Sequence, residues 1–159
     1  MLSIRESTAQ DGAAILRIAS AEPLFSQQEA ETVAELLHDY LERADHNGYF
    51  FLTAESDGTL LGFACYGPTP LTHGTFDLYW ICVRRDLQRQ GAGKALMQRV
   101  EEEVRQRAGR LIVLDTSGRH DYAPTRRFYE SLGYTRAATL PDYYAPGDDL
   151  ILFLKRLSD

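Results

Sequence analysis

Cysteine is scarce in this sequence: only Cys65 and Cys82 occur among 159 residues, which excludes a fold stapled by several disulfides. Both lie in apolar, strand-like stretches, so we expect small buried side chains in a reducing compartment. No apolar run is long enough to span a membrane, and no charged-then-apolar signal segment opens the chain. These absences predict a cytoplasmic protein with no membrane partner.

An excess of positive charge is also missing, since the formal net charge is −6. This balance argues against a general nucleic-acid binder and slightly favours cationic substrates such as amines. No Gly-x-Ser-x-Gly elbow or Cys–His nucleophile pattern is present. We predict no metal site, because the four histidines show no metal-ligand spacing: His38, His46, His73 and His120.

The chain has the length of one domain, and no linker, repeat or low-complexity segment divides residues 1–159. Helical spacing of apolar residues predicts helices over 11–20, 29–44, from the glycines near 91 to about 108, and from 124 to 133. Strand patterns occur near 2–5 and over 48–55, 60–66, 75–83, 111–114, 134–140 and 150–157. The run 111–114 is apolar throughout, which predicts a strand buried on both faces. This order predicts an α/β (α+β) fold with one mixed sheet covered by helices.

A glycine-containing turn between the apolar run 78–83 and the following helix is the most informative motif: Gln88-Arg89-Gln90-Gly91-Ala92-Gly93-Lys94. The first backbone N–H groups of a helix have no partner within it, and the helix dipole makes that end positive. Glycine lets an anion approach the backbone closely. Arg84 and Arg85 add positive charge nearby. The turn therefore predicts a binding site for a phosphorylated ligand.

Two common phosphate loops do not fit this turn. A Walker A loop needs Ser or Thr after Gly-Lys, but Ala95 follows Lys94, and the dinucleotide fingerprint needs a third glycine. The spacing Gln/Arg-x-x-Gly-x-Gly/Ala after a strand instead resembles the acetyl-CoA pyrophosphate loop of the GCN5-related N-acetyltransferases (GNAT). A second motif of this family occurs in the expected order: Arg127-Phe128-Tyr129-Glu130-Ser131-Leu132-Gly133-Tyr134. Phe128 and Leu132 would also pack inward on any amphipathic helix.

The resemblance covers nearly the whole chain and implies a seven-stranded, mixed, mostly antiparallel sheet flanked by about four helices. It implies that the sheet splays between its fourth and fifth strands. Acetyl-CoA is the implied cosubstrate. Its pantetheine arm should face the backbone of Ile81, Cys82 and Val83, and its pyrophosphate the backbone N–H groups of Gln88, Arg89, Gln90, Gly91, Ala92, Gly93 and Lys94. Tyr129 matches the family tyrosine near the thioester sulfur, which can protonate the departing thiolate.

A base must deprotonate the attacking ammonium, directly or through a water. Asp77 precedes the glycine turn on its strand, where histone-type relatives have a glutamate. Asp115 ends the next strand, where ribosomal N-terminal relatives have one. Glu130 should point to another side of its helix. The alternatives are that both aspartates are solvated or cap loops, since some relatives use no side-chain base. No covalent acetyl-enzyme is expected.

The acceptor is left open by the sequence. Tyr122 stands where many relatives have Asn, and Thr125 where Ala is usual. The segments 141–144 and 148–150 resemble a stretch of the N-terminal-alanine acetyltransferases. Either a small molecule or a protein N-terminus or lysine would suit the aromatic residues near the expected cleft: Phe25, Tyr79, Tyr122, Tyr143 and Tyr144.

A different class of function is a non-catalytic acyl-CoA-binding sensor or regulatory module, and Tyr129 favours the enzyme over it. Homodimers are common in the family, so a homodimer is one expected assembly. The remaining acidic run, Glu101-Glu102-Glu103, is expected to be a solvated helix face.

Overall fold

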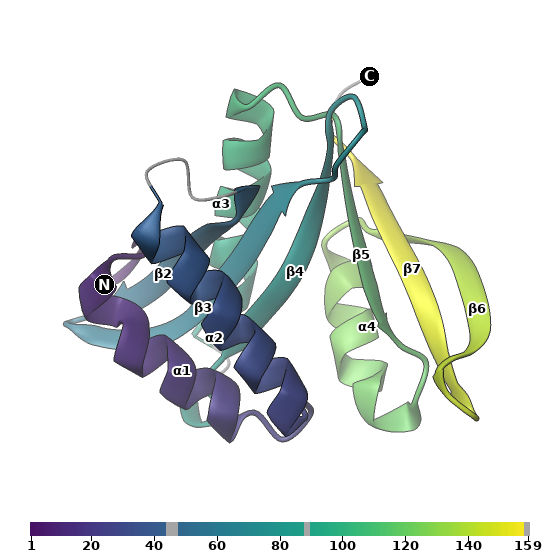
Figure 1. Ribbon diagram of the computed structural model, residues 1–159, viewed down its shortest axis with the longest axis horizontal. Helices are drawn as coiled ribbons and strands as arrows, with labels where there is room; N and C mark the ends of the chain where they lie inside the picture. The colour runs from purple at the N-terminus through teal and green to yellow at the C-terminus, as the bar shows by residue number, and fades with distance from the viewer. Residues whose placement is uncertain (44–47, 88–89, 158–159) are drawn as a thin grey trace.

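One seven-stranded sheet organises the chain, in the order β1-β2-β3-β4-β5-β7-β6. The computed structural model describes residues 1–43, 48–87 and 90–157, and Figure 1 shows their arrangement. The strands are β1 (Leu2–Glu6), β2 (Phe50–Ser56), β3 (Thr59–Pro68), β4 (Thr75–Val83), β5 (Leu111–Ser117), β6 (Thr135–Ala145) and β7 (Asp148–Arg156). The four α-helices of the described residues are α1 (Gly12–Ala21), α2 (Gln27–Glu42), α3 (Ala92–Gln106) and α4 (Ala123–Ser131).

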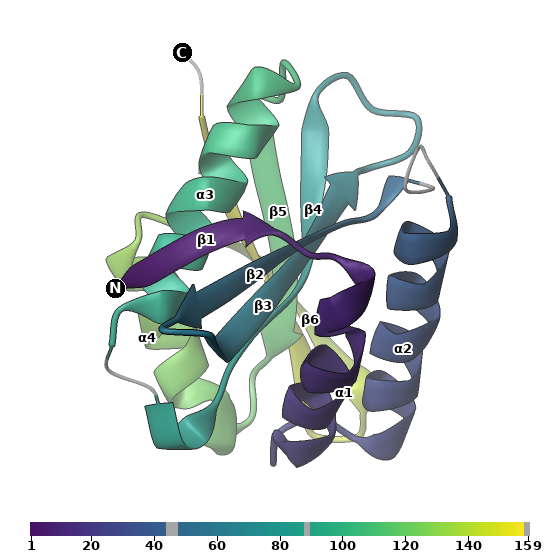
Figure 2. The same cartoon turned by 90° about the vertical axis from the view of Figure 1, so that its left-hand side faces the viewer.

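All strand pairs are antiparallel except β4 and β5, which run parallel. The predicted mixed, mostly antiparallel seven-stranded sheet is therefore confirmed. Helices α1 and α2 cover one face of the sheet, here called the front, and α3 covers the back (Figure 2). The front core contains Ile15, Val33 and Phe63. The back core contains Leu96 of α3 and also Tyr129 of α4.

The sheet splits between β4 and β5. These strands pair only from Thr75 opposite Leu111 to Asp77 opposite Val113, although β4 continues to Val83. Beyond Asp77 the two strands diverge, which is visible in Figure 1 as a widening V. The predicted splay between the fourth and fifth strands is confirmed, and it divides the molecule into a half built on β1–β4 and a half built on β5–β7.

A β-bulge in β4 lies next to the split. Trp80 is opposite Cys65 and Leu78 is opposite Tyr66, so Tyr79 is an extra residue in the ladder. A bulge shifts the alternation of side chains and bends the strand. Leu78 therefore packs on the back core, whereas Tyr79 and Trp80 both pack on the front core. The strand that borders the split is bent where it leaves its neighbour.

Local signals in the sequence explain the element ends. Asp57 (φ 50°) and Gly58 (φ 79°) adopt the left-handed conformations that a tight hairpin demands. The Ser26 side chain accepts a bond from the Glu29 N–H, and the Glu29 carboxylate accepts one from the Ser26 N–H, as a capping box predicts. Gly133 (φ 92°) ends the turn after α4. Residues adjacent in sequence therefore determine these three element ends.

Two strand predictions were wrong. The run 111–114 was expected to be buried on both faces, but in β5 buried residues alternate with more exposed ones. Ile112 and Leu114 pack in the back core, whereas the front core is built from residues of the other half of the molecule. Strand β6 was expected to end near Leu140, but it continues to Ala145, with a register shift between these two residues. Pro141 is tolerated because β6 is the edge strand, where a missing N–H breaks no ladder bond.

The expectation of a solvated face at Glu101 was also wrong, because Glu101 is 7% exposed. Its carboxylate accepts hydrogen bonds from Lys155 Nζ (2.9 Å) and from the Tyr134 hydroxyl (3.1 Å). Lys155 also donates to the Leu132 carbonyl at 2.8 Å. Glu101 lies on α3, whereas its partners belong to the other half of the sheet. This buried ion pair therefore ties the two halves together behind the split.

Removing one charge of this pair is expected to destabilise the fold. Lys155→Met leaves the Glu101 carboxylate buried without its cation, and breaking a buried pair costs about 3–5 kcal/mol. Because the Lys155 side chain is 26% exposed, we expect the lower end, and a melting temperature about 6–12 °C lower. Arg84→Met is the matched control: its partner Asp86 is exposed, and such pairs contribute about 0–1 kcal/mol. Equal melting temperatures for the two variants would show that the Glu101–Lys155 pair does not hold the two halves together.

Candidate active site

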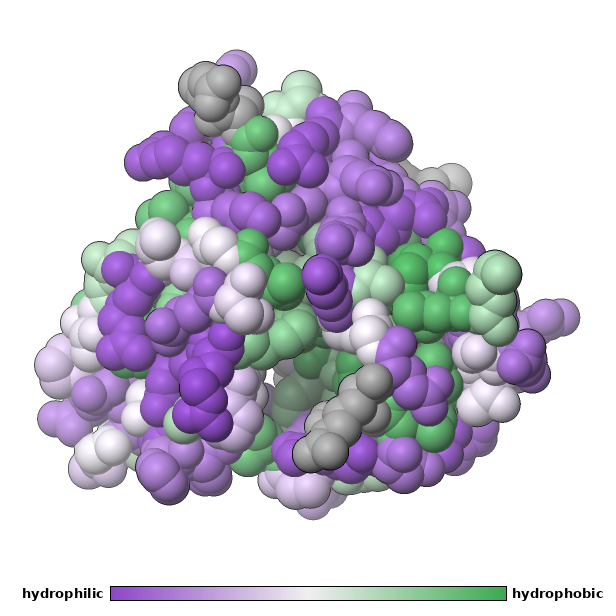
Figure 3. Space-filling view, turned by 180° about the vertical axis from the view of Figure 1, so that it is seen from behind, coloured by the Kyte–Doolittle hydropathy of each residue, from purple (hydrophilic) through white to green (hydrophobic). Residues whose placement is uncertain are grey.

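The split is bordered by the β4 edge that has no strand partner beyond Asp77 in the part of the chain that the structure describes. Ile81 and Cys82 lie on this stretch, and the Cys82 side chain is turned into the front core, 3.9 Å from Glu22 Oε2. The Cys82 side chain therefore does not face the split. The space-filling view from behind shows the molecule hollowed between its two halves (Figure 3). Backbone amide groups along an open strand edge can bind an amide-rich chain.

The glycine turn lies at the start of α3, below this edge. Gly91 is the N-cap of α3 with φ 80°, and a Cβ there would meet nothing within 4 Å. A Cβ on Gly93 would lie 3.3 Å from the Phe128 ring. Gln90 and Lys94 are exposed. The helix start is thus open to solvent and fits an anion bound by backbone N–H groups. Gln88 and Arg89 lie outside the described residues.

The expected positive charge around this turn is partly neutralised. The Arg84 guanidinium donates to Asp86 at 2.8 Å, and the Arg85 guanidinium donates to Glu22. Lys94 remains an exposed cation beside the helix start. Among the residues that the structure describes, the electrostatic attraction at the turn therefore comes mainly from the backbone N–H groups and from Lys94.

The two candidate bases project from the front face of the split. Asp77 is half-buried, and its Oδ2 accepts a hydrogen bond from Thr69 Oγ1 at 2.7 Å. Burial raises the pKa of Asp77, and the charge of Asp115 raises it further, whereas the Thr69 bond opposes the shift. Asp115 is exposed and accepts a 2.5 Å hydrogen bond from the Tyr144 hydroxyl. The structure thus brings the two carboxylates into one electrostatic neighbourhood but gives them different surroundings.

Tyr129 reaches the split from the back, on α4. Its ring packs against Tyr134 (6.0 Å) and Phe153 (6.1 Å), and the residue is 6% exposed. Burial raises the pKa of Tyr129, and the charge of Asp115 adds to the shift. Within the described residues its hydroxyl has no hydrogen-bond partner, yet no buried side-chain polar atom there lacks one. The hydroxyl oxygen is therefore accessible, and it remains protonated at neutral pH.

The expected aromatic residues are distributed over the front. The Tyr79 ring contacts that of Tyr49 at 5.5 Å. Tyr143 and Tyr144 form a perpendicular pair at 5.1 Å. The Tyr122 hydroxyl bonds the Leu24 carbonyl. Phe25 and Tyr79 are half-buried, and both pack against the front core.

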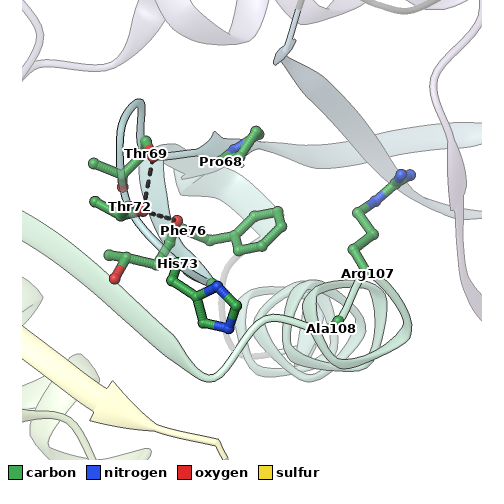
Figure 4. A pocket seen from close by; sticks show the side chains of 9 residues that line it. Pro68, Thr69, Thr72, His73, Phe76, Arg107 and Ala108 are labelled. Atoms are coloured by element: carbon green, nitrogen blue, oxygen red, sulfur yellow. Dashed lines mark hydrogen bonds between the residues drawn. The ribbon is translucent and has the colours of Figure 1, made fainter.

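Two partners of the carboxylates carry no signal in the sequence. Thr69 occurs in a Gly-Pro-Thr-Pro segment that predicts only a strand end, and the β6 extension that carries Tyr144 was not expected. Thr69 also lines a separate cavity of about 330 Å³ between the β3–β4 connection and the end of α3 (Figure 4). There the Thr72 hydroxyl donates to the Thr69 carbonyl at 2.8 Å. None of the expected site residues lines this cavity.

Residues 1–43, 48–87 and 90–157 show two further features. No group of three or more His, Cys, Asp or Glu side chains there is arranged to hold a metal ion, and the absence of a metal stays a prediction. No helix in the same ranges is long and apolar enough to cross a membrane.

Comparisons with known proteins agree on one family. Residues 13–134 match the model of the acetyltransferase (GNAT) family. A putative GNAT acetyltransferase of Desulfovibrio desulfuricans has 40% identity and a TM-score of 0.95, over 99% of this chain and 100% of that one. An uncharacterized N-acetyltransferase of Methanocaldococcus jannaschii is 31% identical over 107 residues, 67% of this chain but only 65% of that protein.

A more distant structure shares the fold alone. The ribosomal-protein-S18-alanine N-acetyltransferase of Escherichia coli is 23% identical, with a TM-score of 0.80 over 100% of this chain and 96% of that one.

Proposed function

The chain belongs to the acetyltransferase (GNAT) family, and we propose that it transfers an acetyl group from acetyl-CoA directly to a primary amine. The observation that supports this most is the meeting of three groups at the split in the sheet. Asp77 and Asp115 approach from the front, and the accessible hydroxyl of the buried Tyr129 approaches from the back. A thioester threaded between β4 and β5 would lie between a base and an acid.

The residues of the split fit acetyl-CoA, which supplies the activated acetyl group. The backbone of Ile81, Cys82 and Val83 would hold the pantetheine arm along the edge of β4. The N–H groups at the start of α3, with Gly91 in its left-handed conformation, would hold the pyrophosphate. Lys94 would add charge to this end of the site. The remaining loop residues Gln88, Arg89, Gln90, Ala92 and Gly93 are proposed to contribute backbone groups.

The proposed reaction needs no covalent enzyme intermediate. The acceptor ammonium first loses a proton to Asp77, directly or through a water, and its nitrogen then attacks the thioester carbonyl. The C–N bond forms, the C–S bond breaks, and Tyr129 gives its proton to the departing thiolate. The acylated nitrogen loses its second proton, which returns to the Tyr129 phenolate directly or through water, and Asp77 releases the first proton to solvent. Backbone N–H groups on the β4 edge would stabilise the oxyanion of the tetrahedral intermediate. Both substrates must be bound together, so a ternary complex is required.

Asp77 suits the role of base better than Asp115. Burial raises the pKa of Asp77, and a base with a pKa closer to neutrality accepts a proton more readily than an exposed carboxylate. The Asp115 carboxylate is already engaged by the Tyr144 hydroxyl. We therefore assign Asp115 to binding the cationic acceptor, together with the exposed rings of Tyr143 and Tyr144.

The carboxylates and the exposed tyrosine rings at the split indicate the chemical class of the acceptor. Carboxylates and aromatic faces both favour a cation, so a primary amine on a small molecule, a lysine or a protein N-terminus would suit them. The fold shared with the ribosomal-protein-alanine acetyltransferase supports the last of these as a proposal. A cytoplasmic location and a homodimer remain predictions from the sequence.

Initial-rate kinetics test the proposal. CoA release from acetyl-CoA, measured against varied amine concentration, is expected to give intersecting double-reciprocal lines, because both substrates must be bound before the acetyl group moves. Parallel lines with an acetylated protein would contradict direct transfer. Tight acetyl-CoA binding without turnover on any amine would point instead to the sensor module.

Substitutions at the glycine turn are expected to weaken acetyl-CoA binding. At Gly91 a valine would be strained at φ 80° and would project into the open space that a pyrophosphate needs. At Gly93 a Cβ would press on the Phe128 ring at 3.3 Å. Calorimetry of folded Gly91→Val should show a loss of acetyl-CoA affinity of at least about tenfold, or 1.4 kcal/mol. Gly147→Val, at another positive-φ glycine far from the turn in sequence, is the matched control. Unchanged acetyl-CoA affinity in folded Gly91→Val would show that the pyrophosphate does not bind at this turn.

A further inference from the structure

A side-chain bridge crosses the split on its front side. The Tyr122 hydroxyl donates a hydrogen bond of 2.9 Å to the backbone carbonyl of Leu24. Leu24 lies in the turn between α1 and α2, whereas Tyr122 ends the short 3-10 helix that leads into α4. The two residues belong to the two halves that separate beyond Asp77. Figure 1 shows the turn at the bottom of the view, close to the start of α4.

The turn that receives this bond is fixed to the first half of the molecule. The Glu22 carboxylate accepts a bond from the Leu24 N–H at 3.1 Å and is held by the Arg85 guanidinium. The Phe25 N–H bonds the Glu22 carbonyl at 3.1 Å, and the Phe25 ring packs against the front core. The Leu24 carbonyl is thus held in place as an acceptor for Tyr122.

The other end of the bridge is equally well placed. Tyr122 is half-buried, and burial raises its pKa to about 12, so its hydroxyl remains a donor throughout the physiological range. The Arg119 guanidinium lies over its ring at 5.8 Å. The chain thus places a long, rigid aromatic side chain across the mouth of the split. A shorter side chain at this position would need the two halves to approach one another.

We propose that Tyr122 is a specificity-determining residue, whose bridge to Leu24 restricts the acceptor to an amine carried on a slender chain without bulky rings. This rests on the proposed acetyl transfer. An acceptor must reach Asp77 from the front, where the bridge borders one side and the pair of Tyr143 and Tyr144 borders another. A bulky, ring-bearing amine can enter only if the turn of 22–26 moves, and the bridge opposes that movement.

The test compares acceptors of different width in Tyr122→Phe, which keeps the ring and removes only the bridging hydroxyl. The matched control is Tyr40→Phe. The Tyr40 hydroxyl also donates to a backbone carbonyl, that of Ser7, at 2.8 Å, but within one half of the molecule, and burial raises its pKa to about 12 as well.

We expect the ratio of kcat/KM for an aminoglycoside to that for a tripeptide N-terminus to rise roughly tenfold or more in Tyr122→Phe. The same ratio should be unchanged in Tyr40→Phe, and the KM for acetyl-CoA should be unchanged in both.

The outcomes separate this inference from the proposed function. If wild-type protein acetylates an amine and Tyr122→Phe leaves the ratio unchanged, the inference fails and the function stands. If the wild-type protein acetylates no amine, the proposed acetyl transfer fails. Amide hydrogen exchange then tests the Tyr122–Leu24 hydrogen bond by itself. Faster exchange of the Leu24 and Phe25 amides in Tyr122→Phe than in Tyr40→Phe supports the bridge, and equal exchange overturns it.

Discussion

Tyr129→Phe is expected to fold and bind acetyl-CoA normally but to turn over about 10²–10⁴-fold more slowly, the usual contribution of a general acid. The substitution keeps the ring and its contacts with Tyr134 and Phe153. It removes a hydroxyl that has no partner among the described residues, so no internal hydrogen bond is lost. The raised pKa of Tyr129 keeps the phenol protonated, as an acid requires. Measurement of kcat and of acetyl-CoA affinity checks this expectation.

Tyr129→Ala separates chemistry from packing. Loss of a buried aromatic ring lowers the free energy of unfolding by about 3–5 kcal/mol. The melting temperature should therefore fall in Tyr129→Ala and stay near that of the wild type in Tyr129→Phe. A wild-type kcat in Tyr129→Phe, combined with a destabilised Tyr129→Ala, would assign the residue to packing and remove the acid from the mechanism.

Asp77→Asn is expected to lower kcat/KM about 10²–10⁴-fold near neutral pH, the range for a general base, with little change in acetyl-CoA affinity. Because the pKa of Asp77 is raised above its ordinary value of 3.8, the wild-type rate should begin to fall at a higher pH than an exposed aspartate would give. Below that pKa the carboxyl is protonated and cannot act as a base. The deficit of the Asn variant should shrink at alkaline pH, where free amine is abundant. A pH–rate profile of both proteins measures these effects.

Asp115→Asn is the matched control for this assignment. It removes the neighbouring charge that helps to raise the Asp77 pKa, so the acidic limb of the profile should move to lower pH. It should also raise the KM for a cationic acceptor. If Asp115→Asn loses the acidic limb while Asp77→Asn keeps it, the two roles are reversed. Full activity in the double variant at every pH would exclude a side-chain base.

Local patterns were sufficient to predict the order of the elements, whereas the split in the sheet was expected only from the resemblance to the GNAT family. The hairpin at Asp57-Gly58, the cap at Ser26 and the glycine turn at Gly91 each depend on residues adjacent in sequence, and backbone sterics determine them. Tyr129 and Asp77 were selected through the same resemblance, because each stands at a position where the family has a catalytic residue.

Contacts between distant segments could not be read in the same way. Glu101 looked like a solvated residue because its partners, Tyr134 and Lys155, lie 33 and 54 residues away, and charge spacing along a helix reports only neighbours within one turn. The bond between Tyr122 and Leu24 spans 98 residues, and no periodicity encodes it. The length of β6 was missed because Pro141 signals a break, whereas its edge position tolerates it.

The most direct test of the central claim is to incubate the protein with acetyl-CoA and a panel of primary amines and to quantify both products. The panel should include peptide N-termini, lysine peptides, polyamines and aminoglycosides, with mass spectrometry for the acetylated amine and thiol titration for CoA. Transfer at the split predicts one N-acetylated amine per CoA released for at least one acceptor, with the yield strongly reduced in Tyr129→Phe. CoA release without acetylated amine, or product formation at the same rate in Tyr129→Phe, would contradict it.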